Sequence, residues 1–157
     1  MAGDCKSANS WRIRMAADQT HVRASVLIVE GDSISRAALR WLLEDLGFEA
    51  VAVSDLAGAR QAIARKTPEI LILDLNLPDG DGIDLLAEIR AARSAVVVAI
   101  VTGITNSLKL HEVTALKPDA LFGKPIDIDD FDNWLVKQLA NFALASTGKR
   151  TLQNAAA

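Results

Sequence analysis

The sequence contains few of the residues that stabilise or anchor a protein by special means. Its single cysteine, Cys5, excludes an internal disulfide and a thiolate metal site. The longest apolar run, residues 95–101, is far shorter than the ~20 residues of a membrane-spanning helix. Basic residues do not outnumber acidic ones (17 against 20), so the positive excess that non-specific nucleic-acid binding and polybasic membrane anchoring need is missing. Residues 1–24 contain no apolar secretory signal. We therefore expect a cytoplasmic protein that binds neither nucleic acid nor membrane.

Hydrophobic residues are abundant, at 50% of the 157 residues, so a core needs no metal or disulfide. Apolar runs rich in β-branched residues and without alternation predict strands covered on both faces. Between them lie segments with helical periodicity, for which Ser33 and Ser54 are candidate N-caps and Gly47 is a candidate C′ residue. The predicted strands are 26–29, 49–53, 70–73, 96–101 and 120–122, and the predicted helices are 33–46, 55–66, 82–93, 105–116 and 127–145.

Strand and helix alternate five times, which predicts an α/β fold with a doubly wound parallel sheet and helices on both faces. In this architecture ligands bind outside the carboxyl ends of the strands. The expected domain covers residues 25–145. Residues 1–24 are expected to form a flexible leader and residues 146–157 a flexible tail.

Polar residues follow four of the predicted strands. Glu30 follows the first strand and Asp74 the third, Thr102 ends the fourth, and Lys124 follows the fifth. Each residue alone is typical of a turn or a helix cap. The fold, however, brings all four strand ends to one edge of the sheet, which makes that edge a candidate site.

These residues, together with the segment 74–82 (DLNLPDGDG), give the chain a resemblance to the receiver domains of two-component response regulators over about residues 25–142. The resemblance implies a flavodoxin-like five-stranded sheet of order 2-1-3-4-5. It implies that Asp74 is the phosphoacceptor, that Thr102 is the switch hydroxyl, and that Lys124 contacts the phosphoryl group. It also implies a cis bond between Lys124 and Pro125.

In function, the resemblance implies a phosphoprotein of a phosphorelay rather than an enzyme. Its partner would be a sensor histidine kinase or a histidine phosphotransfer protein, which transfers a phosphoryl group to Asp74 to form an aspartyl phosphate. Only 32 residues follow Pro125, and the predicted last helix takes most of them. We therefore expect a stand-alone receiver that signals through protein–protein contact and not through a DNA-binding domain.

The acid pair of the family is incomplete in this sequence. The resemblance implies a Mg²⁺ ion held by Glu30, Asp74 and the carbonyl group of Asn76. Gly31 stands where the family has the aspartate that touches the metal, and it offers no ligand. Asp32 is an alternative ligand, although its position also suits a helix cap. The sequence therefore predicts weakened Mg²⁺ binding and slowed phosphoryl transfer.

The positions where aromatic residues occur, or are missing, raise three further questions. Leu121 stands where the family usually has a tyrosine or phenylalanine switch, and strand alternation sends Phe122 to the other face. Coupling between Thr102 and the outer surface is therefore expected to be weaker or differently built. Trp41, at the edge of a helix face, is either partly buried or a docking anchor. Trp134 and its apolar neighbours in the last helix form either an ordinary buried face or a homodimer seam.

Two other functions are weighed against the receiver. The missing acid could mark a phosphate-independent pseudo-receiver, an interaction or dimerisation scaffold. A phosphatase with Asp74 as nucleophile needs a general acid two residues later, and Asn76 cannot serve as one.

Overall fold

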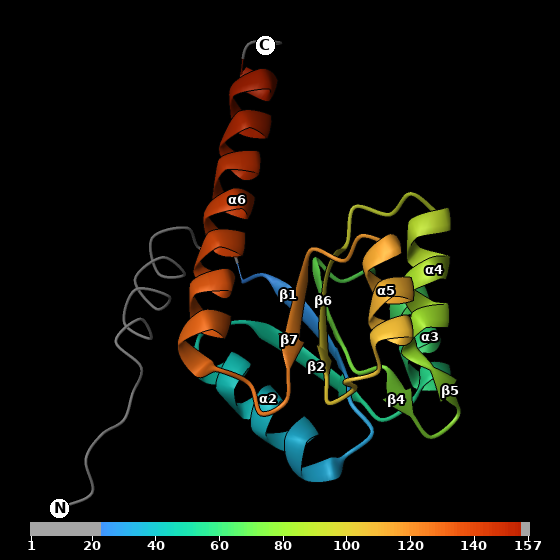
Figure 1. The fold of residues 1–157 in the computed structure, drawn as a ribbon. Coiled ribbons are helices and arrows are strands. Elements are labelled where there is room, and N and C mark those ends of the chain that lie inside the picture. Colours follow the sequence, from blue (N-terminus) through green and yellow to red (C-terminus); the bar gives the residue numbers. More distant parts are fainter. Residues whose placement is uncertain (1–22, 155–157) are drawn as a thin grey trace, which may run out of the picture. The chain divides into compact units, whose positions relative to one another are not determined.

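A five-stranded parallel sheet forms the centre of the unit Ser25–Asp127 in the computed structural model, which describes residues 23–154 (Figure 1). The strand order is β2-β1-β3-β6-β7, which is 2-1-3-4-5 when these strands are numbered along the chain. The predicted fold class and strand order are therefore confirmed. The strands are β1 (Ser25–Val29), β2 (Glu49–Val53), β3 (Ile70–Leu73), β6 (Val97–Thr102) and β7 (Ala120–Gly123).

The register of the sheet determines which residues meet at its carboxyl edge. Val29 pairs with Leu73, and Leu73 pairs with Ile100. On the far side of β6, Thr102 pairs with Gly123. The residue after each of β1, β3 and β7 therefore leaves the sheet at a common edge. All four residues of β3 are buried between its neighbours, as its uninterrupted apolar sequence predicts.

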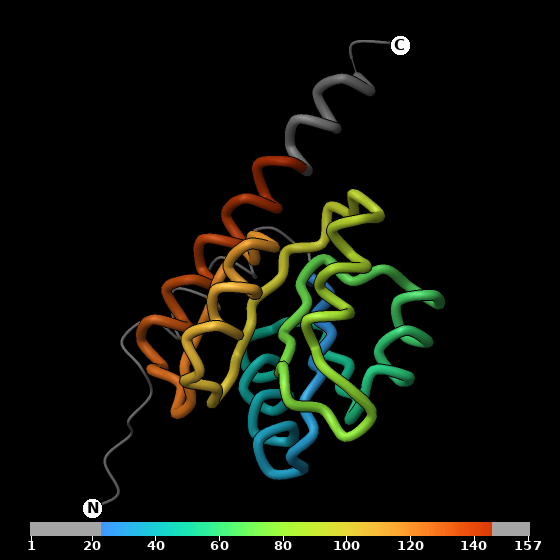
Figure 2. Tube along the Cα trace, turned by 45° about the vertical axis from the view of Figure 1, so that its right-hand side comes forward, coloured from blue at the N-terminus to red at the C-terminus, as the bar shows by residue number. Residues whose placement is uncertain are grey.

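Four helices cover the sheet, with α2 on one face and α3, α4 and α5 on the other (Figures 1 and 2). Apolar residues such as Leu39 and Leu43 of α2 and Leu85 and Leu86 of α4 are buried. Each predicted helix of this unit is present, and its ends lie within two residues of the prediction. The helices are α2 (Ser33–Asp45), α3 (Leu56–Arg65), α4 (Gly82–Ala91) and α5 (Ser107–Ala115).

The N-cap of α2 is Asp32, the alternative to Ser33 that the sequence also offered, whereas the N-cap of α3 differs from the prediction. Asp32 and Asp55 take the positions predicted for Ser33 and Ser54, and each carboxylate accepts a hydrogen bond from an amide of the first turn. Aspartate and serine are comparable N-caps, and here the aspartates have the extended backbone that an N-cap residue needs; their negative charge also suits the positive end of the helix dipole. The prediction that Gly47 is the C′ residue of the first helix is confirmed, since Gly47 has φ +92°.

A small antiparallel hairpin, β4 (Asn76–Leu77) and β5 (Gly80–Asp81), was not predicted. At its tip, Asp79 accepts hydrogen bonds from the amides of Leu56 (2.8 Å) and Ala57 (3.0 Å), at the start of α3. The hydrogen bond from Leu56 holds the pKa of Asp79 below its usual value. The hairpin therefore fastens the segment that follows β3 to a helix that precedes β3 in the chain.

Helix α6 (Ile128–Asn154) belongs to a second unit. It continues nine residues beyond the predicted end at Ala145, into the segment expected to be a tail. Its first turn contains Asp129 and Asp130, and Phe131 and Leu135 are buried. Phe131 also stacks on Trp134, with ring centroids 6.3 Å apart. The predicted leader lies outside the described residues except for residues 23 and 24, and residues 155–157 lie outside them too.

None of the helices in the described part of the chain has both the length and the apolar character needed to cross a membrane.

Gly82, the first residue of α4, lies directly against the backbone of β3's carboxyl end. A Cβ atom at this position would collide with the carbonyl oxygen of Asp74 and lie 2.9 Å from the Cα atom of Leu75. The Gly82 amide donates a 2.9 Å hydrogen bond to the Leu75 carbonyl. Only glycine allows this approach, which fixes the backbone on either side of Asp74.

We predict that Gly82→Ala lowers the free energy of unfolding by about 1–3 kcal/mol, because the backbone around Asp74 must move to admit the methyl group. Urea denaturation measures this loss. Gly123→Ala is the matched control, since no atom lies within 4 Å of the Cβ position there. Equal stability of the two variants would contradict the prediction.

Candidate functional site

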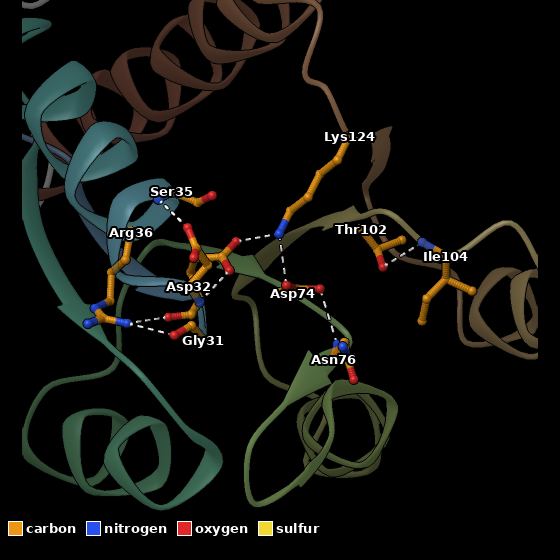
Figure 3. A network of polar contacts seen from close by, with 10 residues as sticks. Gly31, Asp32, Ser35, Arg36, Asp74, Asn76, Thr102, Ile104 and Lys124 are labelled. Carbon is orange, nitrogen blue, oxygen red and sulfur yellow. Dashed lines mark hydrogen bonds and ion pairs between the residues drawn. The ribbon is translucent and has the colours of Figure 1, made fainter.

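Two acidic residues and one lysine meet at the carboxyl edge of the sheet. The Lys124 ammonium group donates hydrogen bonds to Glu30 Oε2 (2.7 Å) and Asp74 Oδ2 (2.9 Å). Figure 3 shows the Lys124 side chain pointing at Asp74. The three residues follow β7, β1 and β3, respectively. The bond between Lys124 and Pro125 is cis, as the resemblance implied.

Asp74 is only 7% exposed, but it lines an open pocket of about 450 Å³. Its Oδ1 accepts a hydrogen bond from the Asn76 amide at 3.1 Å, and its Oδ2 accepts one from Lys124. A small group can therefore reach this carboxylate from solvent while the protein fixes both of its oxygens. The pocket is lined by Glu30, Gly31, Asp32, Asp74, Asn76, Leu77, Pro78 and Lys124.

Thr102 ends β6, the strand next to β3 on the side away from β1. The residue is buried, and its Oγ1 accepts a hydrogen bond from the Ile104 amide at 3.3 Å (Figure 3). That bond uses a lone pair of the oxygen and leaves the hydroxyl proton available to donate.

Lys124 supplies the positive charge that faces both carboxylates of the site. Partial burial by itself lowers the pKa of this lysine. The hydrogen bonds and the negative charges of Asp74 and Glu30 outweigh that effect, and the pKa lies above its usual value of 10.5. Glu30 is 2% exposed, so its charge in particular depends on this partner. The lysine is therefore a fixed cation beside a reachable carboxylate.

The predicted metal ligands fit a divalent cation only in part. Both carboxylate oxygens of Glu30, and both of Asp74, already accept hydrogen bonds from protein N–H groups. Asp32 caps α2 through Oδ1, which accepts from the Ser35 amide at 2.8 Å. In the part of the chain that the structure describes, no three His, Cys, Asp or Glu side chains are grouped to hold a metal ion.

The space beside Gly31 shows what the missing side chain would reach. A Cβ atom there would make ordinary contacts, 3.4 Å from Pro78 Cδ and 3.5 Å from the Asn76 carbonyl oxygen. An aspartate at position 31 therefore fits, and it would begin next to the carbonyl oxygen that the resemblance assigns to the metal.

Sequence reasoning missed one residue that shapes the site. Arg36 of α2 donates from Nη1 to the carbonyl oxygens of Glu30 (2.8 Å) and Gly31 (3.2 Å). A bond to a backbone carbonyl needs no particular side chain at its other end, so the sequence pattern carries no signal for it. The available hint was the position of Arg36 one turn after the acidic segment.

Two aromatic questions are answered in part. Trp41 is 68% exposed, so the expectation that it is partly buried is wrong. The face of α2 that packs inward contains Leu39 and Leu43 and leaves Trp41 outside. Leu121, at the family's switch position, is exposed, whereas Phe122 is half-buried, as strand alternation predicts.

Comparison with known proteins gives a consistent answer. The model of the response regulator receiver domain family matches residues 26–135. The chain is 34% identical over 106 residues to the transcriptional regulatory protein KdpE of Mycobacterium tuberculosis, which covers 68% of this chain and 46% of that protein. It is 30% identical over 105 residues to the virulence transcriptional regulatory protein PhoP of Salmonella typhimurium, with 67% and 47% covered. The chain thus spans about half the length of these curated relatives.

Solved structures agree with the sequence relatives. A CheY-like response regulator receiver domain from Methylobacillus flagellatus superposes with a TM-score of 0.66 at 31% identity, over 74% of this chain and 99% of that chain. The signal receiver domain of a putative Luxo repressor protein from Vibrio parahaemolyticus superposes with a TM-score of 0.70 at 28% identity, over 80% and 97%.

We predict that Lys124→Met lowers the free energy of unfolding by about 2 kcal/mol near neutral pH, because it leaves two buried carboxylates without their cation. Since the pKa of Lys124 is raised, its stabilisation is complete below the usual lysine pKa of 10.5 and is lost as the pH rises through the raised value. The difference between wild type and variant should therefore shrink at alkaline pH.

Chemical denaturation from neutral to strongly alkaline pH measures this difference. Lys66→Met is the matched control, because Lys66 forms an exposed ion pair with Glu49 that contributes little. A difference that grows with pH would contradict the assignment.

Proposed function

Because the chain belongs to the response regulator receiver domain family, we propose that it accepts a phosphoryl group on Asp74 from a phosphohistidine. The donor would be a sensor histidine kinase or a histidine phosphotransfer protein. Members of this family are phospho-accepting signalling domains of two-component systems rather than enzymes acting on a substrate. The observation that carries the proposal is the pairing of Asp74, in an open pocket, with the Lys124 ammonium group at 2.9 Å.

The transfer is an in-line displacement at phosphorus. A carboxylate oxygen of Asp74 forms the new O–P bond while the N–P bond of the phosphohistidine breaks, and the imidazole nitrogen keeps that electron pair. Charge spreads over the three equatorial oxygens of the transferring group. Lys124 offers a positive charge for these oxygens, and the Asn76 amide and the Thr102 hydroxyl group offer hydrogen bonds.

Receiver domains generally bind Mg²⁺ at the phosphorylation site. In this chain, Asp74, Glu30 and the carbonyl group of Asn76 would hold the ion, with Asp32 as a further ligand, and water would complete its coordination. The ion supplies positive charge for the phosphoryl oxygens when bound. We propose that it binds weakly, because Gly31 offers no carboxylate and the remaining ones are occupied by N–H donors.

The outer face of α2 is the surface we propose for the phosphodonor. Ile34 and Trp41 are 79% and 68% exposed, and Ala37 and Ala38 between them are exposed as well. The spacing of these four residues makes a continuous apolar stripe on the helix. It begins two residues after Asp32, which lines the pocket, so a bound helix could present its histidine to Asp74.

We propose that the chain passes its signal on through contact with another protein. The curated relatives are named as transcriptional regulators and are about twice as long as the matched segment. For this chain we propose a cytoplasmic receiver whose phosphorylation changes its binding to a target protein, with a homodimer through α6 as one form of that contact.

The second candidate is a phosphate-independent pseudo-receiver that serves as a scaffold. The absent carboxylate at Gly31 favours it, as does the complete hydrogen bonding of Glu30 and Asp74. The two candidates differ in one outcome, which is the formation of an acyl phosphate at Asp74.

We predict that the protein gains one phosphoryl group on incubation with phosphoramidate and Mg²⁺, and that Asp74→Asn abolishes the gain. Intact-protein mass spectrometry measures it. Asp84→Asn, which changes an exposed aspartate of α4, is the matched control and should behave as wild type. No gain in the wild type would support the scaffold. A gain that persists in Asp74→Asn would show that another residue is the acceptor.

We predict that Gly31→Asp tightens Mg²⁺ binding by about tenfold or more, because it adds a charged oxygen ligand beside the Asn76 carbonyl group. Isothermal titration calorimetry with MgCl₂ measures the affinity. Gly31→Ala adds the Cβ atom without the carboxylate and should bind as weakly as wild type. Low-micromolar binding by the wild type would contradict a weakened site.

A further inference from the structure

Arg36 lies beside the site but contacts no phosphoryl-binding side chain. Its Nη1 donates to two consecutive carbonyl groups, those of Glu30 and Gly31. Other arginines of this unit, Arg40 and Arg60 among them, pair with carboxylates. Arg36 forms no such pair within the described residues, although acidic side chains surround the loop it binds. Its hydrogen-bonding capacity is directed at the backbone of residues 30 and 31.

This contact sets the orientation of two peptide groups. In a trans peptide the C=O and N–H bonds point in opposite directions. Two carbonyl groups gathered at Arg36 therefore turn the amides of Gly31 and Asp32 away from it. In Figure 3, Arg36 lies on one side of Gly31 and Asp74 on the other. The Asp32 amide indeed donates to Glu30 Oε1, at 3.0 Å.

The orientation of the Asp32 amide determines where the Glu30 carboxylate lies. One oxygen of that carboxylate accepts from Asp32, and the other accepts from Lys124 at 2.7 Å. Lys124 in turn contacts Asp74. A series of hydrogen bonds therefore leads from Arg36 through the loop and Glu30 to the lysine beside the acceptor.

The loop needs this support because of Gly31. Glycine restricts the backbone least of all residues, and at this position it has no side chain to bind a metal ion or a neighbour. Its backbone lies outside the left-handed region, so its conformation is not one that only glycine adopts. The two hydrogen bonds from Arg36 fix the 30–32 loop on the side away from the pocket.

We propose that Arg36 is a positioning residue for phosphoryl transfer to Asp74, because it orients the 30–32 loop so that Glu30 holds Lys124 against the acceptor. The proposal rests on the proposed function. Both bonds come from one nitrogen atom, so a lysine ammonium group at position 36 can replace them.

The test compares the rates at which the full chain is phosphorylated by phosphoramidate with Mg²⁺, followed by intact mass. Arg36→Ala should slow the reaction about tenfold, because the acceptor's cation is no longer held in place. Arg36→Lys should recover most of the rate. Arg40→Ala is the matched control, since Arg40 lies on the same helix and forms an ion pair with exposed Glu44. It should react at the wild-type rate.

A second readout follows the loop itself. The amide proton of Asp32 donates to a carboxylate, so its NMR resonance should lie downfield. Arg36→Ala should move it upfield, whereas Arg36→Lys and Arg40→Ala should leave it in place. A residue that only adds stability would leave this resonance unmoved in a fully folded variant.

The outcomes separate this inference from the proposed function. If the wild type accepts no phosphoryl group, the proposed function fails, and the Asp32 resonance still tests whether Arg36 orients the loop. If the wild type is phosphorylated but Arg36→Ala reacts as fast, or Arg36→Lys restores neither readout, the inference fails alone. Should Arg36→Ala not fold, Arg36→Met, which keeps the aliphatic stem, replaces it with the same expectations.

Discussion

The ion pairs of Lys124 are the interaction on which the site depends. Glu30 and Asp74 leave neighbouring strands at the same level, so their charges are brought together in a buried position by the register of the sheet. One ammonium group, 2.7 Å from one carboxylate and 2.9 Å from the other, offsets part of this negative charge. Removing these charges from water lowers the stability of the folded state. The same arrangement favours the reaction, because a nucleophilic carboxylate already lies next to the positive charge that a transferring phosphoryl group needs.

The sheet could be predicted because its signal is local and repeated. Ile70–Leu73 is an uninterrupted apolar run, which is typical of a strand covered on both faces, and helices with regular apolar spacing separate the runs. The hairpin Asn76–Asp81 has two-residue strands, too short for any periodicity to register. For the helix caps the sequence left Asp32 and Ser33 open and misplaced the cap at Asp55 by one residue, because serine and aspartate are both good caps and backbone geometry decides which one binds.

Some residues of the candidate site could be predicted from the sequence in the same way, and others could not. Asp74 and Lys124 could be placed together from topology, since the carboxyl ends of parallel strands share an edge. Arg36 and Asp79 could not, because both bind backbone groups, and a backbone amide or carbonyl is the same at every position of the sequence. Trp41 was misjudged because a residue at the border of a helix face turns inward or outward according to small rotations of the helix. The sequence therefore reveals the reacting groups more readily than the groups that hold them.

The bonds from Asp79 to the first two amides of α3 have a consequence for cooperativity. The first turn of a helix is usually where fraying begins, since its amides lack partners within the helix. Here the partner is supplied by a residue more than twenty positions later, in the hairpin that begins with Asn76. Fraying of α3 and loosening of the segment after Asp74 are thereby coupled into one local unfolding event. Without these bonds, the two segments would unfold locally as separate events, each with its own free energy of local unfolding.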